Sequence, residues 1–148
     1  MTDHEFSARA SHYLHEAGWT PTRSVPIDEY LEELRQAGYE VPESARRFFQ
    51  SFGGLLLAPG AQEEMRLDPP PGMGKVSTRR IATYVPRVGK KLVPIGTADR
   101  GWQLLMMDSD GVVYSGNDEW LARVADSGPV AIDLLLTDPS LPDAVDIP

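Results

Sequence analysis

Apolar residues recur with the period of an α-helix in three stretches of the first half of the chain, and the recurrence stops at a pair of glycines. The stretches are 6–17, 27–34 and 41–52, and the glycines are Gly53 and Gly54. Spacings of three and four residues place the apolar side chains of each stretch on one face of a helix. The sequence therefore predicts three amphipathic helices, the third of which ends at the glycines.

After the glycines, short apolar runs alternate with turn residues and indicate strands. The runs are 55–57, 64–67, 93–96, 102–107 and 112–115. Asp110 and Gly111 predict a two-residue hairpin turn between the last two runs, because these residue types suit the left-handed conformation that such turns need. Pro94 marks the run 93–96 as a strand with a proline edge, since proline has no backbone N–H to donate.

Further helices are expected in the second half. The basic segment 77–84 predicts a helix that Pro86 interrupts. Asn117 is expected to cap a short helix through Val124, and Pro129 to open a last one. Helices, then strands, then helices indicate an α+β fold, with N-terminal helices packed on a mainly antiparallel sheet and C-terminal helices completing it.

The length of 148 residues, 41% of them apolar, suits a single domain over residues 1–148 with one core. The segment 68–74 is rich in proline and glycine and predicts an exposed loop. The proline-containing tail 138–148 is expected to fray. The first residues show no features of a secretory signal, and no apolar stretch approaches the length of a membrane span, so we expect a cytoplasmic protein.

Charge constrains the partner. With 22 acidic and 14 basic residues the formal net charge is −8, which disfavours direct binding of nucleic acid or of a membrane surface. The segment 75–91 carries bases and no acid, whereas acids dominate from Asp99 onward. This pattern suits a charged protein partner. The absence of cysteine excludes disulfides, thiolate zinc sites and thiol nucleophiles.

Motifs for catalysis or metal binding are weak. His12 and His15 lie off the apolar stripe of the first helix and are interpreted as a solvated face. Asp108 and Gly111 begin like a calcium loop, but the glycine comes too early, and a hairpin turn explains both. No serine stands in a G-x-S-x-G elbow, and the glycine pairs lack the Lys-Ser/Thr of a phosphate loop. We therefore predict no metal, no cofactor and no enzymatic activity.

Several motifs, taken in order, resemble those of the SUKH superfamily, and in particular its third subfamily of bacterial immunity proteins. They are Phe6-Ser7, Ala17-Gly18-Trp19-Thr20-Pro21-Thr22-Arg23, Gly38-Tyr39, the helix from Ala45 through Phe48 to Phe52-Gly53-Gly54-Leu55, Pro94-Ile95-Gly96-Thr97-Ala98, Leu104-Leu105-Met106, and the Asp-x-x-Gly-x-x-Tyr pattern of Asp108, Gly111 and Tyr114. The helix followed by Phe-Gly-Gly-Leu is the most specific of these. The resemblance covers most of the chain.

The resemblance implies an α+β domain that binds and neutralises a cognate toxin by occluding it, commonly a nuclease or deaminase. An acidic antidote is consistent with a basic toxin. The shared motif residues are expected to be scaffold: Trp19, Pro21, Arg23, Phe48, Gly53, Gly54, Pro94, Gly96 and Tyr114. Arg23 is expected to pair with an acidic helix face, and Trp19 and Trp102 to belong to the core. Recognition is then expected on surface acids: Asp99, Asp108, Asp110, Asp118 and Glu119.

Two other functions stay open at this point. The same superfamily contains regulatory protein-interaction modules that bind no toxin. A neighbouring gene for a large secreted protein that ends in a small basic enzymatic domain would favour immunity over regulation. A hydrolase acting on a cationic or peptide substrate would instead lose turnover when one pocket carboxylate is replaced.

Overall fold

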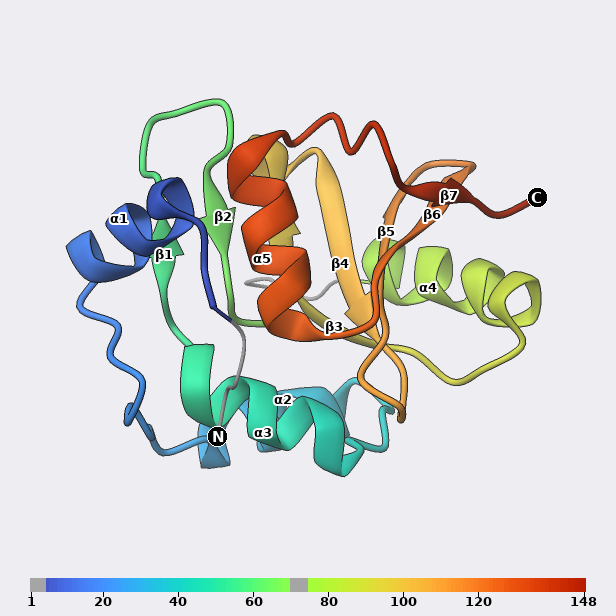
Figure 1. Ribbon diagram of the computed structural model, residues 1–148. Helices are drawn as coiled ribbons and strands as arrows, with labels where there is room; N and C mark the ends of the chain where they lie inside the picture. The colour runs from blue at the N-terminus through green and yellow to red at the C-terminus, as the bar shows by residue number, and fades with distance from the viewer. Residues whose placement is uncertain (1–4, 70–74) are drawn as a thin grey trace.

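The computed structural model describes residues 5–69 and 75–148 and shows one antiparallel sheet with helices on both faces (Figure 1). The strands lie in the sheet in the order of the sequence. They are β1 (Leu56–Leu57), β2 (Met65–Arg66), β3 (Val93–Ala98), β4 (Gln103–Met107), β5 (Val113–Asn117), β6 (Trp120–Ala125) and β7 (Val145–Asp146). Helices and sheet together confirm the predicted single α+β domain.

The helices follow the predicted apolar stripes. They are α1 (Ala8–Glu16), α2 (Asp28–Gln36), α3 (Glu43–Phe52), α4 (Lys75–Val88) and α5 (Gly128–Thr137), with a short 3₁₀ turn, η1 (Asp99–Gly101), between β3 and β4. Ser7 caps α1 and Ser127 caps α5, each by accepting a hydrogen bond from a backbone N–H of the first turn. The three predicted N-terminal helices are confirmed.

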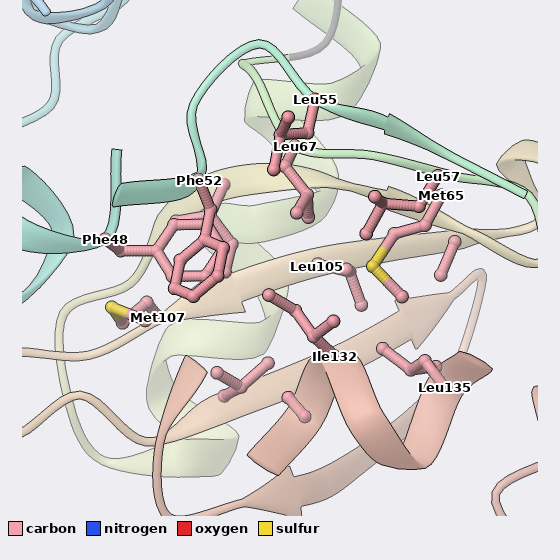
Figure 2. Close-up of a cluster of buried hydrophobic side chains, with 14 of the residues drawn as sticks. Phe48, Phe52, Leu55, Leu57, Met65, Leu67, Leu105, Met107, Ile132 and Leu135 are labelled. Atoms are coloured by element: carbon pink, nitrogen blue, oxygen red, sulfur yellow. The ribbon is translucent and has the colours of Figure 1, made fainter. Parts of the chain in front are cut away.

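The sheet buries both of its faces. Helices α1, α3 and α5 pack on one face, where the buried side chains include Phe48, Phe52, Leu57, Met65, Leu105, Met107, Ile132 and Leu135 (Figure 2). Helix α4 covers the other face, where Ile81 and Tyr84 pack with Met106, Tyr114 and Leu121. Consecutive residues of β4 therefore enter different clusters, which confirms β4 as a central strand.

Pro94 lies in a strand that is interior to the sheet. It pairs with Met106 of β4 beside a bulge, whereas the ladder to β2 is formed at Thr97. Proline is tolerated because the missing N–H falls at an irregular position of the ladder.

Helix α4 runs through Pro86 to Val88, past the end predicted at Tyr84. Tyr84 is fully buried and Val85 and Val88 pack against the same cluster, while Pro86 is exposed. Apolar contacts on both sides of the proline outweigh the single helical hydrogen bond that proline removes.

Residues 117–124 form the β5–β6 hairpin, so the predicted short helix is wrong. Asn117 pairs with Trp120, and Gly116 pairs with Leu121. The cap signal of Asn117 is local, whereas the ladder to β5 satisfies backbone groups along the whole strand and buries Leu121 and Val124.

The tail 138–148 is held on the sheet and does not fray as predicted. Leu141 is buried, and β7 pairs with β6. The guanidinium of Arg87 on α4 donates to the carbonyl oxygens of Ile147 (2.7 Å) and Pro148 (3.2 Å). These partners are distant in sequence, so composition could not indicate them.

The predicted exposed loop 68–74 is described only at its start. Asp68 is partly buried and Pro69 is buried, so these two residues are not exposed as predicted. Burial raises the pKa of Asp68. Residues 70–74 lie outside the described residues.

Candidate partner-binding surface at one end of the sheet

Three connections meet at one end of the sheet, which we call the loop end: residues 58–64, 99–102 and 118–119. Successive antiparallel strands turn alternately at two ends, so the β1–β2, β3–β4 and β5–β6 connections share one of them. Figure 1 shows this end at the top, with α2 and α3 at the opposite end. Segments far apart in the sequence thus form one surface.

Trp102 stands on the loop end with 69% of its surface accessible, the highest value for a large apolar residue in the described part of the chain. The expectation that Trp102 belongs to the core is therefore wrong. The tryptophan directly follows η1, outside the paired residues of β4.

The backbone before Trp102 is left-handed at three successive residues. The φ angles are 50° at Asp99, 56° at Arg100 and 88° at Gly101. Only glycine adopts this conformation at no steric cost, so Asp99 and Arg100 are held there by their contacts. The guanidinium of Arg100 donates to the carbonyl oxygens of Gly60 (2.6 Å) and Ala61 (3.1 Å), which ties η1 to the β1–β2 loop.

The acids Asp99, Asp118 and Glu119 all lie at the loop end. The Asp99 carboxylate accepts a hydrogen bond from the Gln62 amide. Asp118 is exposed, has a left-handed φ of 50° and pairs at 3.0 Å with Arg80 of α4. Glu119 is exposed beside it. These three acids are the subset of the predicted recognition residues that the fold brings to one end.

Asp108 and Asp110 lie at the opposite end, in the β4–β5 connection. Asp108 is fully buried, so the expectation that it reaches solvent is wrong. Its Oδ1 accepts from the amides of Asp110 (2.8 Å) and Val112 (3.1 Å), and its Oδ2 accepts from the Tyr114 hydroxyl (2.9 Å). The connection spans 108–112 instead of the predicted two-residue turn, because the side chain folds back to bind the backbone. Asp110 is exposed and pairs with Lys90.

Of the motif residues Trp19, Pro21 and Arg23, the first and the last attach the segment before α2 to the C-terminal part of α3. Trp19 stacks on Phe52 with ring centroids 5.5 Å apart and planes 6° from parallel, while Pro21 is exposed. Arg23 does not pair with an acidic helix face as expected. Its guanidinium donates to the carbonyl oxygens of Ser51 (3.0 Å) and Gly53 (2.8 Å), and so satisfies the C-terminal end of α3.

The motif glycines are required for two different reasons. Gly54 has a φ of 84°, which disfavours a side chain. Gly53 and Gly96 are instead sites of close approach. A Cβ at Gly53 would lie 2.5 Å from the Phe49 carbonyl oxygen, and one at Gly96 would lie 2.1 Å from that of Arg66.

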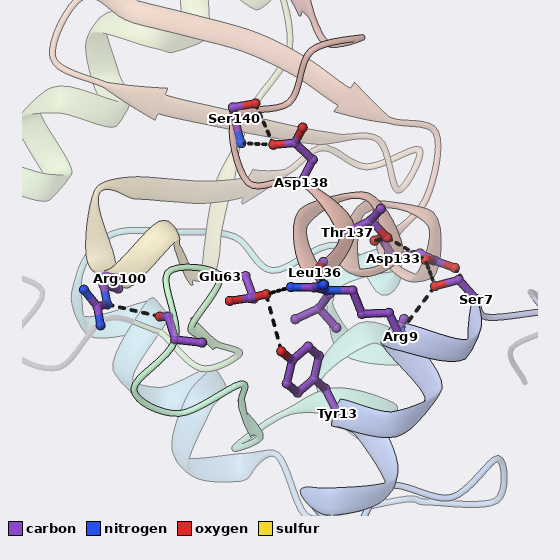
Figure 3. Close-up of polar contacts among 12 residues, drawn as sticks. Ser7, Arg9, Tyr13, Glu63, Arg100, Asp133, Leu136, Thr137, Asp138 and Ser140 are labelled. Carbon is purple, nitrogen blue, oxygen red and sulfur yellow. Dashed lines mark hydrogen bonds and ion pairs between the residues drawn. The ribbon is translucent and has the colours of Figure 1, made fainter.

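Glu63 is a buried acid that the sequence did not single out. It forms an ion pair with Arg9 and accepts from the Tyr13 hydroxyl at 3.4 Å (Figure 3). Its own backbone N–H and the Arg9 guanidinium lower the pKa of the Glu63 carboxyl. Arg9 also donates to the Leu136 carbonyl oxygen at 2.9 Å. The cluster joins the loop end to α1 and α5, and no local pattern marks it because its members are far apart in sequence.

A hollow of about 390 Å³ lies between the C-terminal end of α2 and α4. Tyr39 lines it, and burial raises the pKa of the Tyr39 hydroxyl. Glu40, the carboxylate at its rim, pairs at 3.3 Å with Lys91. Glu40 therefore has a cationic partner within the chain itself.

The described residues contain no group of three His, Cys, Asp or Glu side chains placed to hold a metal. None of the helices within those residues has the length and apolarity needed to cross a membrane.

Fold and surface together define an α+β domain that presents an aromatic and acidic end of its sheet. Residues 6–138 match the sequence model of the SUKH-3 immunity proteins, and the chain belongs to this family. Neither the curated proteins nor the solved structures contain a match. Family membership supports an immunity function and implies a toxin as partner, and proteins of this family are in general not enzymes.

Proposed function

We propose that this chain is a cytoplasmic antidote to a toxin of a bacterial polymorphic system, a nuclease or deaminase, and that the loop end covers the basic groove of that toxin. The observation that carries the proposal is the gathering of Asp99, Asp118 and Glu119 on one end of a family member whose net charge is −8. A toxin that acts on nucleic acid needs a cationic groove for phosphates, and an acidic surface is complementary to it.

A further acid, Asp138, lies close to the same end. Asp138 follows α5, and the Gln103 side chain at the start of β4 donates to the carbonyl oxygen of the adjacent Pro139. The hydroxyl and amide of Ser140 lower the pKa of Asp138, which favours its ionised form. The surface around Trp102 is therefore bordered by carboxylates from three separate segments.

The basic segment offers less free charge than its sequence suggests. Lys90 pairs with Asp110, Lys91 with Glu40, and Arg80 with Asp118. Part of the charge of Asp118 is compensated in the same way, so Asp99 and Glu119 are expected to contribute most to attraction.

The proposal is tested with a variant that removes charge without disturbing the backbone: Asp99→Asn, Asp118→Asn and Glu119→Gln. Asparagine tolerates the left-handed conformation of the two aspartates, so the melting temperature should stay near that of the wild type. The probe is found by searching the neighbouring genes for a secreted protein that ends in a small basic enzymatic domain, and that domain is used. Wild type should bind that domain and protect cells that express it, and the variant should bind at least about tenfold more weakly.

The matched control makes the same change in net charge on α2, at the far end of the molecule: Glu29→Gln, Glu32→Gln and Glu33→Gln. It should protect as the wild type does and should lose far less affinity than the loop-end variant. Cells that die equally with and without the wild-type chain would contradict the immunity proposal for this toxin. Equal loss of binding in both triple variants would show that only net charge matters and would contradict the loop end as the contact surface.

A further inference from the structure

We infer that Trp102 is the anchor of the toxin interface and inserts into an apolar recess of the toxin that is rimmed by lysine or arginine. The inference rests on the proposed function and adds to it the chemistry of the contact. Tryptophan is the residue type most enriched among the side chains that dominate binding energy, because it buries a large area with few rotatable bonds.

The structure holds the backbone of Trp102 from two sides although its side chain has little packing of its own. The Asn117 amide donates to the Trp102 carbonyl oxygen at 2.6 Å, which joins the tryptophan to the β5–β6 hairpin. The Arg100 contacts to Gly60 and Ala61 hold the preceding turn against the β1–β2 loop. A side chain on a fixed backbone loses less conformational entropy on binding than one on a free loop.

The other two tryptophans serve the fold. Trp19 is stacked on Phe52 within the core cluster. Trp120 is partly buried, packs against the same cluster, and its Nε1 donates to the Asp146 carboxylate at 3.1 Å. Within the described residues, Trp102 is thus the tryptophan that presents its ring to solvent.

Charge complementarity indicates which kind of toxin surface contacts Trp102. Asp99 lies three positions before Trp102, and Asp118 follows the Asn117 that binds the tryptophan backbone. An apolar recess without basic residues at its rim would leave these carboxylates to lose water without compensation. A recess rimmed by lysine or arginine instead provides partners for the acids and a cation for the indole face.

The first experiment compares Trp102→Ala with Val145→Ala, a control at another exposed apolar residue, 62% accessible on β7. Both variants should melt near the wild-type temperature. Affinity for the same toxin domain should fall about 30-fold or more for Trp102→Ala. It should stay within about twofold for Val145→Ala.

The second experiment observes binding in the wild type itself, labelled with 5-fluorotryptophan, and uses a variant only to assign a resonance. The ¹⁹F resonance of Trp102, assigned by its absence in Trp102→Phe, should shift on addition of the toxin domain. The resonance of Trp19 should stay in place.

The outcomes separate the inference from the proposed function. If wild type protects and binds, but Trp102→Ala binds equally well and the Trp102 resonance does not move, the anchor is wrong and the immunity role stands. If wild type neither binds nor protects, both the proposed function and the anchor role of Trp102 are wrong. A wild-type dimer that Trp102→Ala converts to monomers without loss of toxin binding would assign Trp102 to self-association and overturn the inference.

Discussion

At the scale of single residues, Asp108 and Tyr114 show how one acid can belong to the core. The buried Asp108 carboxylate is satisfied by two backbone amides and by the Tyr114 hydroxyl, and Lys90 lies 3.9 Å away. A buried charge is tolerated only when it is hydrogen-bonded in this way. The Asp-x-x-Gly-x-x-Tyr pattern is therefore a closed hydrogen-bonding unit that shapes the β4–β5 connection.

Replacing Tyr114 by phenylalanine tests this unit. The change leaves Oδ2 of Asp108 without its hydroxyl donor and should lower the free energy of unfolding by about 1–3 kcal/mol near neutral pH. Burial, together with the Asp108 bond, raises the pKa of Tyr114 from 10.0 to about 12. A raised pKa means that the native state holds the proton more tightly, so this stabilisation is complete below pH 10 and is lost as the pH rises towards 12.

The measurement is urea denaturation of wild type and Tyr114→Phe across the alkaline range. The difference between the two proteins should be constant below pH 10 and should shrink above it. Groups other than Tyr114 titrate in both proteins and cancel in the difference. If the difference in free energy of unfolding did not change with pH, the pKa of Tyr114 would be the same in the folded and unfolded states, and the prediction would be wrong.

At the scale of elements, close packing between α3 and α5 depends on a phenylalanine and a glycine. Phe48 packs against Phe49 and Phe52, with ring centroids 6.0 Å and 5.4 Å away. Gly128 at the start of α5 faces the same ring: a Cβ there would lie 2.4 Å from Phe48 Cδ1. The glycine thus allows α5 to approach α3 closely.

Removing the Phe48 ring should therefore be costly and should change what Gly128 tolerates. Phe48→Ala should lower the free energy of unfolding by about 3–5 kcal/mol, because it leaves a cavity in the core. Gly128→Ala alone should cost about 1–3 kcal/mol through overpacking. In the double variant the added methyl group enters the cavity, so the combined loss should be smaller than the sum. Thermal or urea melts of the four proteins measure this, and strict additivity would contradict the contact.

At the scale of the whole molecule, the sheet separates two kinds of surface. The turns at the loop end carry Asp99, Asp118, Glu119 and the exposed Trp102. The β4–β5 connection at the other end is closed by the buried Asp108 and contacted by α3, where the Ser44 hydroxyl donates to the Asp108 carbonyl oxygen at 2.7 Å. A net charge of −8 adds a long-range field to this arrangement. Such a field steers a basic partner during encounter and is screened by salt.

Association with the toxin domain should therefore depend on ionic strength. Raising the salt concentration should weaken affinity, with most of the loss in the association rate constant and little in the dissociation rate constant. Stopped-flow association and surface-based dissociation measurements separate the two. The α2 triple variant, which carries the same net charge as the loop-end triple variant, controls for total charge. An association rate constant that does not change with salt concentration would count against a basic partner.

Local periodicity was sufficient to predict α1, α2 and α3 and the central position of β4, because the spacing of apolar residues reports directly which faces are buried. Pro129 was the local signal that predicted α5. The amino-acid sequence alone also determined the net charge and the absence of cysteine, since neither depends on folding. The motifs also indicated the family, and most of the motif residues, such as Phe48, Gly53 and Tyr114, have a structural role in packing, close approach or hydrogen bonding.

Only the tertiary structure decided which turns share an end of the sheet. The sequence grouped Asp108 with Asp118 as surface acids, but strand order sends them to opposite ends of the sheet and Asp108 is buried. β7 exists because β6, which is distant in sequence, supplies its hydrogen bonds, and no local signal reports this pairing. The β5–β6 hairpin is local, but β4 and β7 pair with its two outer edges and so favour strand over helix. Trp102 is a residue type common in protein cores, yet its side chain is exposed. Burial depends on which segments pack against a residue, and the tertiary fold decides this.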